Sequence, residues 1–208
     1  MNGSERARAD DGALVARLIA GEARAFGELV DRFHARMVRL AMGFVADRSA
    51  AEEVVQDTWL VVMTGLEGFE GRSSLGTWIF RILANRARTR AVRERRMVPF
   101  SALGDGAEDG DSGLGARFDG VGHWSTPPRA WSEEDPERVC LRREAMEVLG
   151  RAMDALPANQ RLVVMLRDVE GLESDEVCNI LDVSETNQRV LLHRARTKLR
   201  TALEEHLG

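Results

Sequence analysis

The sequence has little of several residue types, and each shortage argues against a class of protein. It has two cysteines, Cys140 and Cys178, and four scattered histidines, too few for a disulfide framework or a zinc cluster. Aromatic residues make up 5% of the 208 residues and tyrosine is absent, which disfavours a β-rich core. No apolar run approaches the roughly 20 residues that cross a bilayer, and the first residues lack the apolar stretch of a signal peptide. We expect a cytoplasmic protein with no metal site, no cofactor and no membrane insertion.

The residues that are abundant favour helices. Apolar residues make up 44% of the chain, enough for a core, and Ala, Leu, Arg and Glu, all good helix formers, are common. The sequence therefore predicts an all-α protein. From the apolar periodicity, helices are expected near 11–20, 23–46, 50–66, 74–96, 136–154, 158–169, 173–181 and 185–205.

Charge divides the chain into three parts. The net charge is −5, yet residues 97–137 alone contain nine acidic and two basic residues together with many glycines. We expect a long flexible acidic linker there, joining two small helical domains at 1–96 and 138–208. Within the linker, Trp124 and Trp131 flank a Pro-Pro pair, which favours an extended piece able to dock on a surface.

Two basic runs lie in the predicted domains. Arg81 to Arg96 contains seven arginines and one acid, and Arg189 to Arg200 contains five basic residues and no acid. Such runs are either solvated helix faces or phosphate-binding surfaces. Because the whole chain is acidic, we expect its binding to free DNA to be weak.

The predicted 50–66 helix has one apolar and one acidic face. Ser49 and Glu52 have the spacing of a capping box at its start. The face expected in the core contains Val55, Trp59, Val62, Met63 and Leu66. On the other face Glu53 and Asp57 lie one turn apart, which is unfavourable unless a cation lies near them. Either the acids suit the helix N-terminus or a basic partner binds this face.

The predicted 74–96 helix has two distinct stripes. The stripe expected to be buried contains Leu75, Ile79, Ile82 and Leu83, and the second contains Trp78, Arg81, Asn85 and Arg88. Aromatic, amide and guanidinium groups on one face suit single-stranded nucleic acid, whose bases stack on rings while arginine follows the backbone. The alternative is a core tryptophan beside a solvated basic face.

Near the C-terminus, two short predicted helices surround the break Asp182–Ser184, a pattern typical of a helix-turn-helix unit but shared by structural helical hairpins. Ser184 is a good N-cap for the second helix. That helix is expected to bury Val190, Leu191 or Ala195, and Leu199, and to project Arg189, Arg194, Arg196 and Lys198. Cys178 lies in an apolar run and is expected to be a small buried residue.

Several motifs together resemble one family. Residues 69–85 read FEGRSSLGTWIFRILAN, and residues 51–59 read AEEVVQDTW. The second half contains LP at 156, QR at 160, LRD at 166, EGL at 170 and RAR at 194. In this order they resemble the extracytoplasmic-function (ECF) group of alternative sigma factors in the sigma-70 family. Leu75, Gly76, Asn187 and Gln188 depart from the group's usual residues.

The resemblance implies three binding surfaces. A polymerase-facing set would dock on the β′ clamp helices of RNA polymerase: Glu53, Gln56 and Asp57. A minus-ten set would open and read the minus-ten element as single strand: Phe69, Ser73, Thr77, Trp78, Arg81, Asn85 and Arg88. A minus-thirty-five set on the last helix would enter the major groove: Arg189, Arg194, Arg196 and Lys198.

The function implied is that of a sigma factor that directs RNA polymerase to promoters in a stress or environmental response and catalyses nothing itself. Implied partners are core polymerase, including its β flap, promoter DNA and an anti-sigma factor. The acidic linker would thread into the polymerase cleft as a phosphate mimic, or act as a plain spacer. A stand-alone helix-turn-helix regulator is the alternative function, but it would leave the polymerase-facing set and the Trp78–Arg88 stripe without a use.

Overall fold

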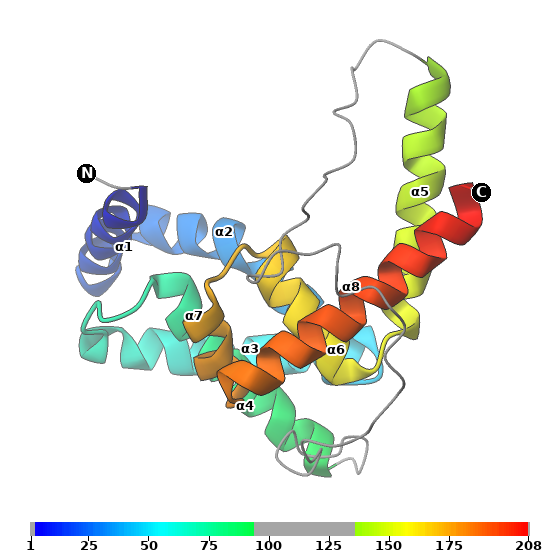
Figure 1. The fold of residues 1–208 in the computed structure, drawn as a ribbon. Coiled ribbons are helices and arrows are strands. Elements are labelled where there is room, and N and C mark those ends of the chain that lie inside the picture. The colour runs from blue at the N-terminus through cyan, green and yellow to red at the C-terminus, as the bar shows by residue number, and fades with distance from the viewer. Residues whose placement is uncertain (1–2, 94–135, 208) are drawn as a thin grey trace.

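The computed structural model describes residues 3–93 and 136–207, and these residues form helices and turns without a strand (Figure 1). The first module contains α1 (Gly3–Ile19), α2 (Ala23–Ala41), α3 (Arg48–Gly65), the short 3-10 helix η1 (Leu66–Gly68) and α4 (Leu75–Arg93). The second contains α5 (Pro136–Ala155), α6 (Ala158–Val164), the π-helical η4 (Met165–Val169), α7 (Ser174–Leu181) and α8 (Glu185–Leu207). The predicted all-α class is confirmed. The predicted linker, with Trp124 and Trp131, lies outside the described residues except at its last two positions.

The first module packs α4 against α2 and α3, while α1 lies on α2 and η1. The buried faces follow helical periodicity: Leu29, Phe33 and Met37 of α2 are fully buried. Phe33 meets Phe80 of α4 edge-on, with ring centroids 6.1 Å apart. Gly76 in the first turn of α4 leaves room for Phe33, because a Cβ there would approach the Phe33 ring to 3.2 Å.

The second module contains the predicted helix-turn-helix unit. The turn passes through Asp182, which takes a left-handed conformation with φ 57°, and α8 begins at Glu185. Ser184 Oγ accepts a hydrogen bond from Asn187 N at 3.2 Å, which confirms Ser184 as the N-cap. Gln188 is buried and accepts a hydrogen bond from Ser174 Oγ at 3.1 Å, so it ties α8 to α7. Helix α8, the second helix of this unit, packs against α5 and α6.

The predicted capping box at the start of α3 was wrong. The helix begins at Arg48, and its N-cap is Asp47, whose carboxylate accepts a hydrogen bond from Ala50 N at 2.8 Å. Glu52 instead pairs with Arg48 one turn earlier, at 2.8 Å. Aspartate one position before the first helical residue satisfies the same free amide groups, so it replaces the expected capping box of Ser49 and Glu52.

Five predicted core positions also differ. Met63 is exposed, and Trp59 and Ile82 are only partly buried, whereas their neighbours Val54, Val62 and Leu83 are buried. Val190 is exposed, and Leu191, Leu192, Ala195 and Leu199 form the buried face of α8. Cys178 is half-buried rather than enclosed. Each of these residues lies at the edge of an apolar stripe, where periodicity does not fix burial.

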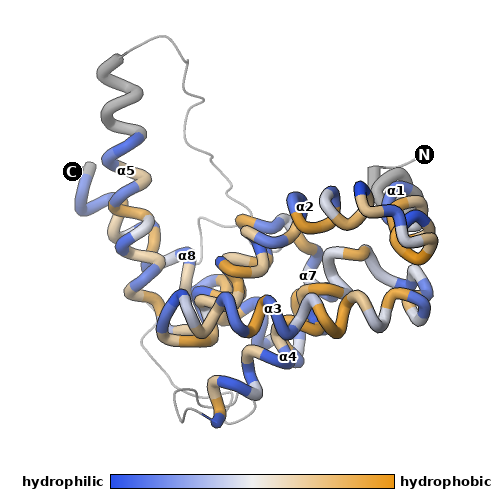
Figure 2. The backbone as a smooth tube through the Cα atoms, turned by 180° about the vertical axis from the view of Figure 1, so that it is seen from behind, coloured by the Kyte–Doolittle hydropathy of each residue, from blue (hydrophilic) through white to orange (hydrophobic). Residues whose placement is uncertain are grey.

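The two modules pack directly on each other and share one continuous apolar core. Gly43, just after α2, faces Leu162 of α6 so closely that a Cβ at position 43 would lie 2.5 Å from Leu162 Cδ2. The side chain of Glu170 is only 4% exposed and pairs with Arg36 and, at 3.7 Å, with Arg39 of α2. Figure 2 shows apolar and polar residues alternating along the helices of both modules, as expected of amphipathic helices that share a core.

Candidate polymerase and promoter interfaces

The polymerase-facing set lies on the exposed face of α3, with Glu53, Gln56 and Asp57 all exposed. Both acids of this set, Glu53 and Asp57, already face cations of α4. Arg90 pairs with Glu53 at 2.5 Å, and Arg86 lies 3.8 Å from Asp57. The cations that the sequence pattern called for near these acids thus come from within the chain, from the neighbouring helix α4. Binding of an external basic partner to this face stays a prediction.

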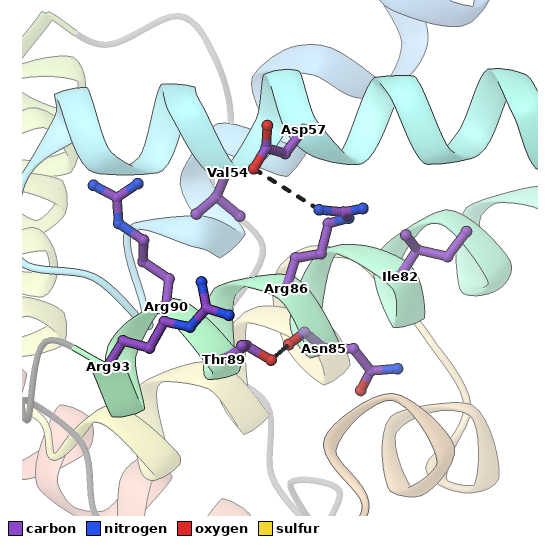
Figure 3. Close-up of a pocket in the computed structure, with 8 residues that line it drawn as sticks. All are labelled: Val54, Asp57, Ile82, Asn85, Arg86, Thr89, Arg90 and Arg93. Carbon is purple, nitrogen blue, oxygen red and sulfur yellow. Dashed lines mark hydrogen bonds and ion pairs between the residues drawn. The ribbon is translucent and has the colours of Figure 1, made fainter.

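That groove holds about 490 Å³ and is basic on its α4 side (Figure 3). Its lining contains Val54, Asp57, Ile82, Asn85, Arg86, Thr89, Arg90 and Arg93. The close-up shows Asn85 pointing away from α3, whereas the arginine side chains reach into the space between the two helices. The groove thus separates the polymerase-facing set on α3 from the minus-ten set on α4.

Within the minus-ten set, Arg81 and Asn85 are exposed one turn apart on α4. Trp78 is half-buried: its ring lies 5.3 Å from that of Phe69 at a tilt of 56° and packs beside Gly65. Trp78 is therefore partly a core residue, as the alternative interpretation held, while Phe69 and Trp78 keep a partly accessible aromatic surface. Ser73, in the loop before α4, is also half-buried, and its hydroxyl donates a hydrogen bond to Ser74 O at 3.3 Å.

The remaining two members of the minus-ten set are covered by the second module. Thr77 is 5% exposed, and its hydroxyl donates a hydrogen bond to Glu176 Oε1 of α7 at 2.5 Å. Arg88 donates from Nη2 to the main-chain oxygen of Leu181 at 2.8 Å. Burial lowers the pKa of Arg88, partly offset by the negative charge of Asp182. Helix α7 thus occupies part of the face expected to bind DNA.

The members of the minus-thirty-five set differ in exposure. Arg189 and Lys198 are exposed, and Arg189 pairs with Glu185 at 2.6 Å within α8. Arg194 is half-buried. Arg196 makes two hydrogen bonds to Asp168 of η4, at 2.6 and 3.0 Å, and its side chain is 19% exposed. A bidentate pair of this kind fixes the position of the guanidinium, so Arg196 braces α8 against η4.

Sequence reasoning missed residues that fix this geometry. Arg86 and Arg90 belong to the basic run, but their pairing with acids of α3 depends on how the helices cross. Glu176 carried no signal beyond being an acid, and Glu170 was noted only as part of the EGL motif, which gave no hint of its pairing with α2. Asp11 of α1 is buried, and a buried aspartate is unusual enough to indicate a specific partner.

Other kinds of site are not evident in the described part of the chain. It contains no group of three or more His, Cys, Asp or Glu side chains placed to hold a metal ion. None of its helices has the length and apolarity needed to span a membrane. Burial raises the pKa of the Cys178 thiol, with Glu185 adding to the effect, so this thiol is poorly suited to redox sensing.

Comparison with known proteins matches both modules to one family. Residues 29–97 match sigma-70 region 2, and residues 146–199 match sigma-70 region 4. The chain is 30% identical over 195 residues to the RNA polymerase sigma-H factor of Pseudomonas aeruginosa, covering 93% of this chain and 94% of that protein. It is 29% identical over 187 residues to the ECF RNA polymerase sigma-E factor of Escherichia coli K12, covering 89% and 90%.

Solved structures show that the fold is shared as well. CnrH, solved in complex with the cytosolic domain of CnrY, has a TM-score of 0.55 at 22% identity, covering 94% of this chain and 97% of that one. The sigma factor RpoE of Bartonella quintana, solved with the anti-sigma factor NepR, has a TM-score of 0.56 at 20% identity, covering 88% and 98%. With both modules matched in order over nearly the whole chain, the protein belongs to the sigma-70 family and is a sigma factor of the ECF group.

Proposed function

We propose that this sigma factor works through three separate surfaces, one for polymerase and two for promoter DNA. The observation that carries the proposal is the arrangement of α4, where exposed Arg81 and Asn85 lie beside the Phe69–Trp78 pair. Guanidinium, amide and aromatic groups on one surface suit unpaired bases and their phosphates. The protein itself would catalyse no reaction, and it would act in the cytoplasm, where RNA polymerase works.

The polymerase-facing set would bind the β′ clamp helices, with Gln56 and Asp57 at the centre of the contact. Both side chains are exposed, and Asp57 keeps 65% of its side chain accessible although Arg86 lies nearby. An ion pair this open contributes little to folding, so Asp57 is available to a basic partner. The second module would bind the β flap of RNA polymerase.

In the second module, α8 would enter the major groove at the minus-thirty-five element. Arg189 and Lys198 are the accessible members of the set, and Arg194 is partly accessible. Arg196 would act mainly by holding α8 on η4 through Asp168. Arginine can bind guanine bidentately or contact phosphates, and these two roles differ in salt dependence.

Binding to a promoter would require the modules to separate. Elements centred near minus ten and minus thirty-five are roughly 25 base pairs apart, or about 85 Å along B-DNA. Helices α4 and α7 are in contact in this structure, and Thr77 and Arg88 are engaged by α7. Core polymerase would stabilise the separated arrangement by binding each module at its own site.

A test of the proposal measures promoter binding and transcription with and without core polymerase. We expect sequence-specific binding and transcript formation only when both proteins are present. Specific binding of the isolated chain to duplex DNA at physiological salt, as a dimer on a palindrome, would instead support a stand-alone helix-turn-helix regulator. An anti-sigma factor, such as NepR is for RpoE, would be a further partner, and a role in a stress or environmental response would follow from its release.

A further inference from the structure

Asp11 of α1 is buried, with 2% of the residue exposed, and both of its carboxylate oxygens are occupied. Oδ1 accepts a hydrogen bond from Arg32 Nη1 of α2 at 2.8 Å, and Oδ2 accepts one from Leu75 N at 2.8 Å. Leu75 is the first residue of α4. A carboxylate from one helix therefore satisfies a free main-chain amide at the start of another, 64 residues later in the chain.

The start of α4 needs this bond. The first amide groups of a helix have no partner within the helix. Ser74 supplies one partner, because its Oγ accepts a hydrogen bond from Thr77 N at 3.1 Å. The amide of Leu75 lies one position too early for that cap and is buried, so Asp11 is its acceptor. The negative charge also lies at the positive end of the helix dipole.

The hydrogen bond between Asp11 and Leu75 lies next to the minus-ten set. Leu75 directly follows the 69–74 loop, and Thr77, Trp78 and Arg81 lie within the next two turns of α4. A shift in the first turn would move Trp78 relative to Phe69, whose ring centroid is only 5.3 Å away. Helix α1 lies outside the segment matched to sigma-70 region 2, which begins at residue 29.

We infer that Asp11 is a positioning residue for the minus-ten surface: it fixes the first turn of α4 and so holds the loop and helix in the geometry that reads the minus-ten element. The inference rests on the proposed minus-ten role of α4. Asp11 itself touches no DNA, because it is enclosed by α2 and the start of α4.

The test compares Asp11→Ala with Asp10→Ala, which removes the same charge from an exposed neighbour on the same helix. Three quantities are measured with full-length protein and core polymerase: polymerase affinity, open-complex formation, and the ratio of activity on a wild-type promoter to that on one with a substituted minus-ten element. For Asp11→Ala we expect polymerase affinity within twofold of wild type and open-complex formation about tenfold lower, the size expected for one hydrogen bond to a charged group. The promoter ratio should also fall, and Asp10→Ala should match wild type.

Two further variants separate positioning from general folding. Asp11→Asn keeps an oxygen acceptor for Leu75 N and should restore most of the promoter ratio. Arg32→Gln leaves the hydrogen bond from Leu75 N to the Asp11 carboxylate in place, so this variant should also keep the promoter ratio near that of wild type. If Asp11→Ala lowers polymerase affinity as much as open-complex formation and leaves the ratio unchanged, Asp11 only supports folding and the inference is wrong.

Amide hydrogen exchange and Asn85→Ala distinguish the failure of the inference from that of the proposed function. Exchange at Leu75 in the free chain should be about tenfold faster in Asp11→Ala than in Asp10→Ala. If Asn85→Ala changes the promoter ratio but Asp11→Ala does not, the positioning role is refuted while α4 remains the reading helix. If neither changes it, the minus-ten assignment is refuted, and the role of Asp11 in promoter reading with it.

Discussion

The guanidinium of Arg88 in α4 donates a hydrogen bond to the main-chain oxygen of Leu181, the last residue of α7, at 2.8 Å. The carbonyl groups at a helix C-terminus are unpaired and carry partial negative charge, so they attract a cation. In this arrangement α7, the first helix of the helix-turn-helix unit, binds the side chain of Arg88, a member of the minus-ten set. The same contact therefore links the two DNA-binding modules and hides part of one of them.

The first prediction concerns Glu170, which joins the modules through Arg36 and Arg39. Glu170→Gln should weaken module packing by roughly 1–2 kcal/mol, less than a fully buried pair, because the two arginine side chains are 30% and 53% exposed. The isolated chain should then bind forked minus-ten DNA several-fold more tightly. Glu205→Gln, exposed near the end of α8, is the control. Equal binding by both variants would argue against masking by the second module.

The second prediction concerns the steric fit at Gly43. Gly43→Ala would place its methyl group against Leu162 and should cost about 1–3 kcal/mol of packing between the modules. Small-angle X-ray scattering of the free chain should show a larger radius of gyration. Gly27→Ala, in α2 with open space around its Cβ, should leave the radius unchanged. A compact Gly43→Ala variant would mean that Leu162 moves aside and the modules stay together.

The third prediction separates polymerase binding from strand opening. Asp57→Ala should weaken polymerase binding about tenfold, or 1.4 kcal/mol, while changing stability by less than about 0.5 kcal/mol because its ion pair is exposed. Asn85→Ala should leave polymerase affinity unchanged and reduce strand opening or minus-ten discrimination. Fluorescence binding assays and permanganate footprinting measure the two effects. Loss of duplex affinity alone in both variants would contradict this division of roles.

The fourth prediction distinguishes two arginines of the minus-thirty-five set. Arg189→Ala should flatten the salt dependence of promoter binding by about one unit if it contacts phosphate, or cost roughly 1–3 kcal/mol of base discrimination if it contacts a base. Arg196→Ala should mainly lower the melting temperature, since it removes the bidentate pair with Asp168. Asp168→Asn should resemble Arg196→Ala in melting. Unchanged salt slope and promoter ranking in Arg189→Ala would refute its contact with DNA.

The fifth prediction concerns Cys178. Because burial raises the pKa of its thiol, the reactive thiolate is scarcer at neutral pH than in free cysteine. In a Cys140→Ser background, alkylation of Cys178 at pH 7 should be slower than that of free cysteine and should accelerate at a higher pH. Faster alkylation than free cysteine would indicate an activated thiol and reopen a redox role.

The sequence by itself determined the helical class, the positions of most helices and the helix-turn-helix turn, and it predicted which residues would bind polymerase and DNA. These follow from local rules: apolar periodicity marks the buried stripe of α4 at Leu75, Ile79 and Leu83, and Ser184 caps α8 as predicted. The family motifs are equally local, since each is read within about 17 residues.

Only the tertiary structure decided which of those residues are free. The pairing of Asp57 with Arg86, the bond from Asp11 to Leu75 and the cover of α7 over Thr77 and Arg88 join residues 29 to 99 positions apart. Such contacts depend on how amphipathic helices cross, and a periodic pattern fixes which face of a helix is buried but not which helix covers it. For that reason the sequence could propose candidate DNA-binding side chains, whereas the packing of the two modules decided which of these side chains are covered.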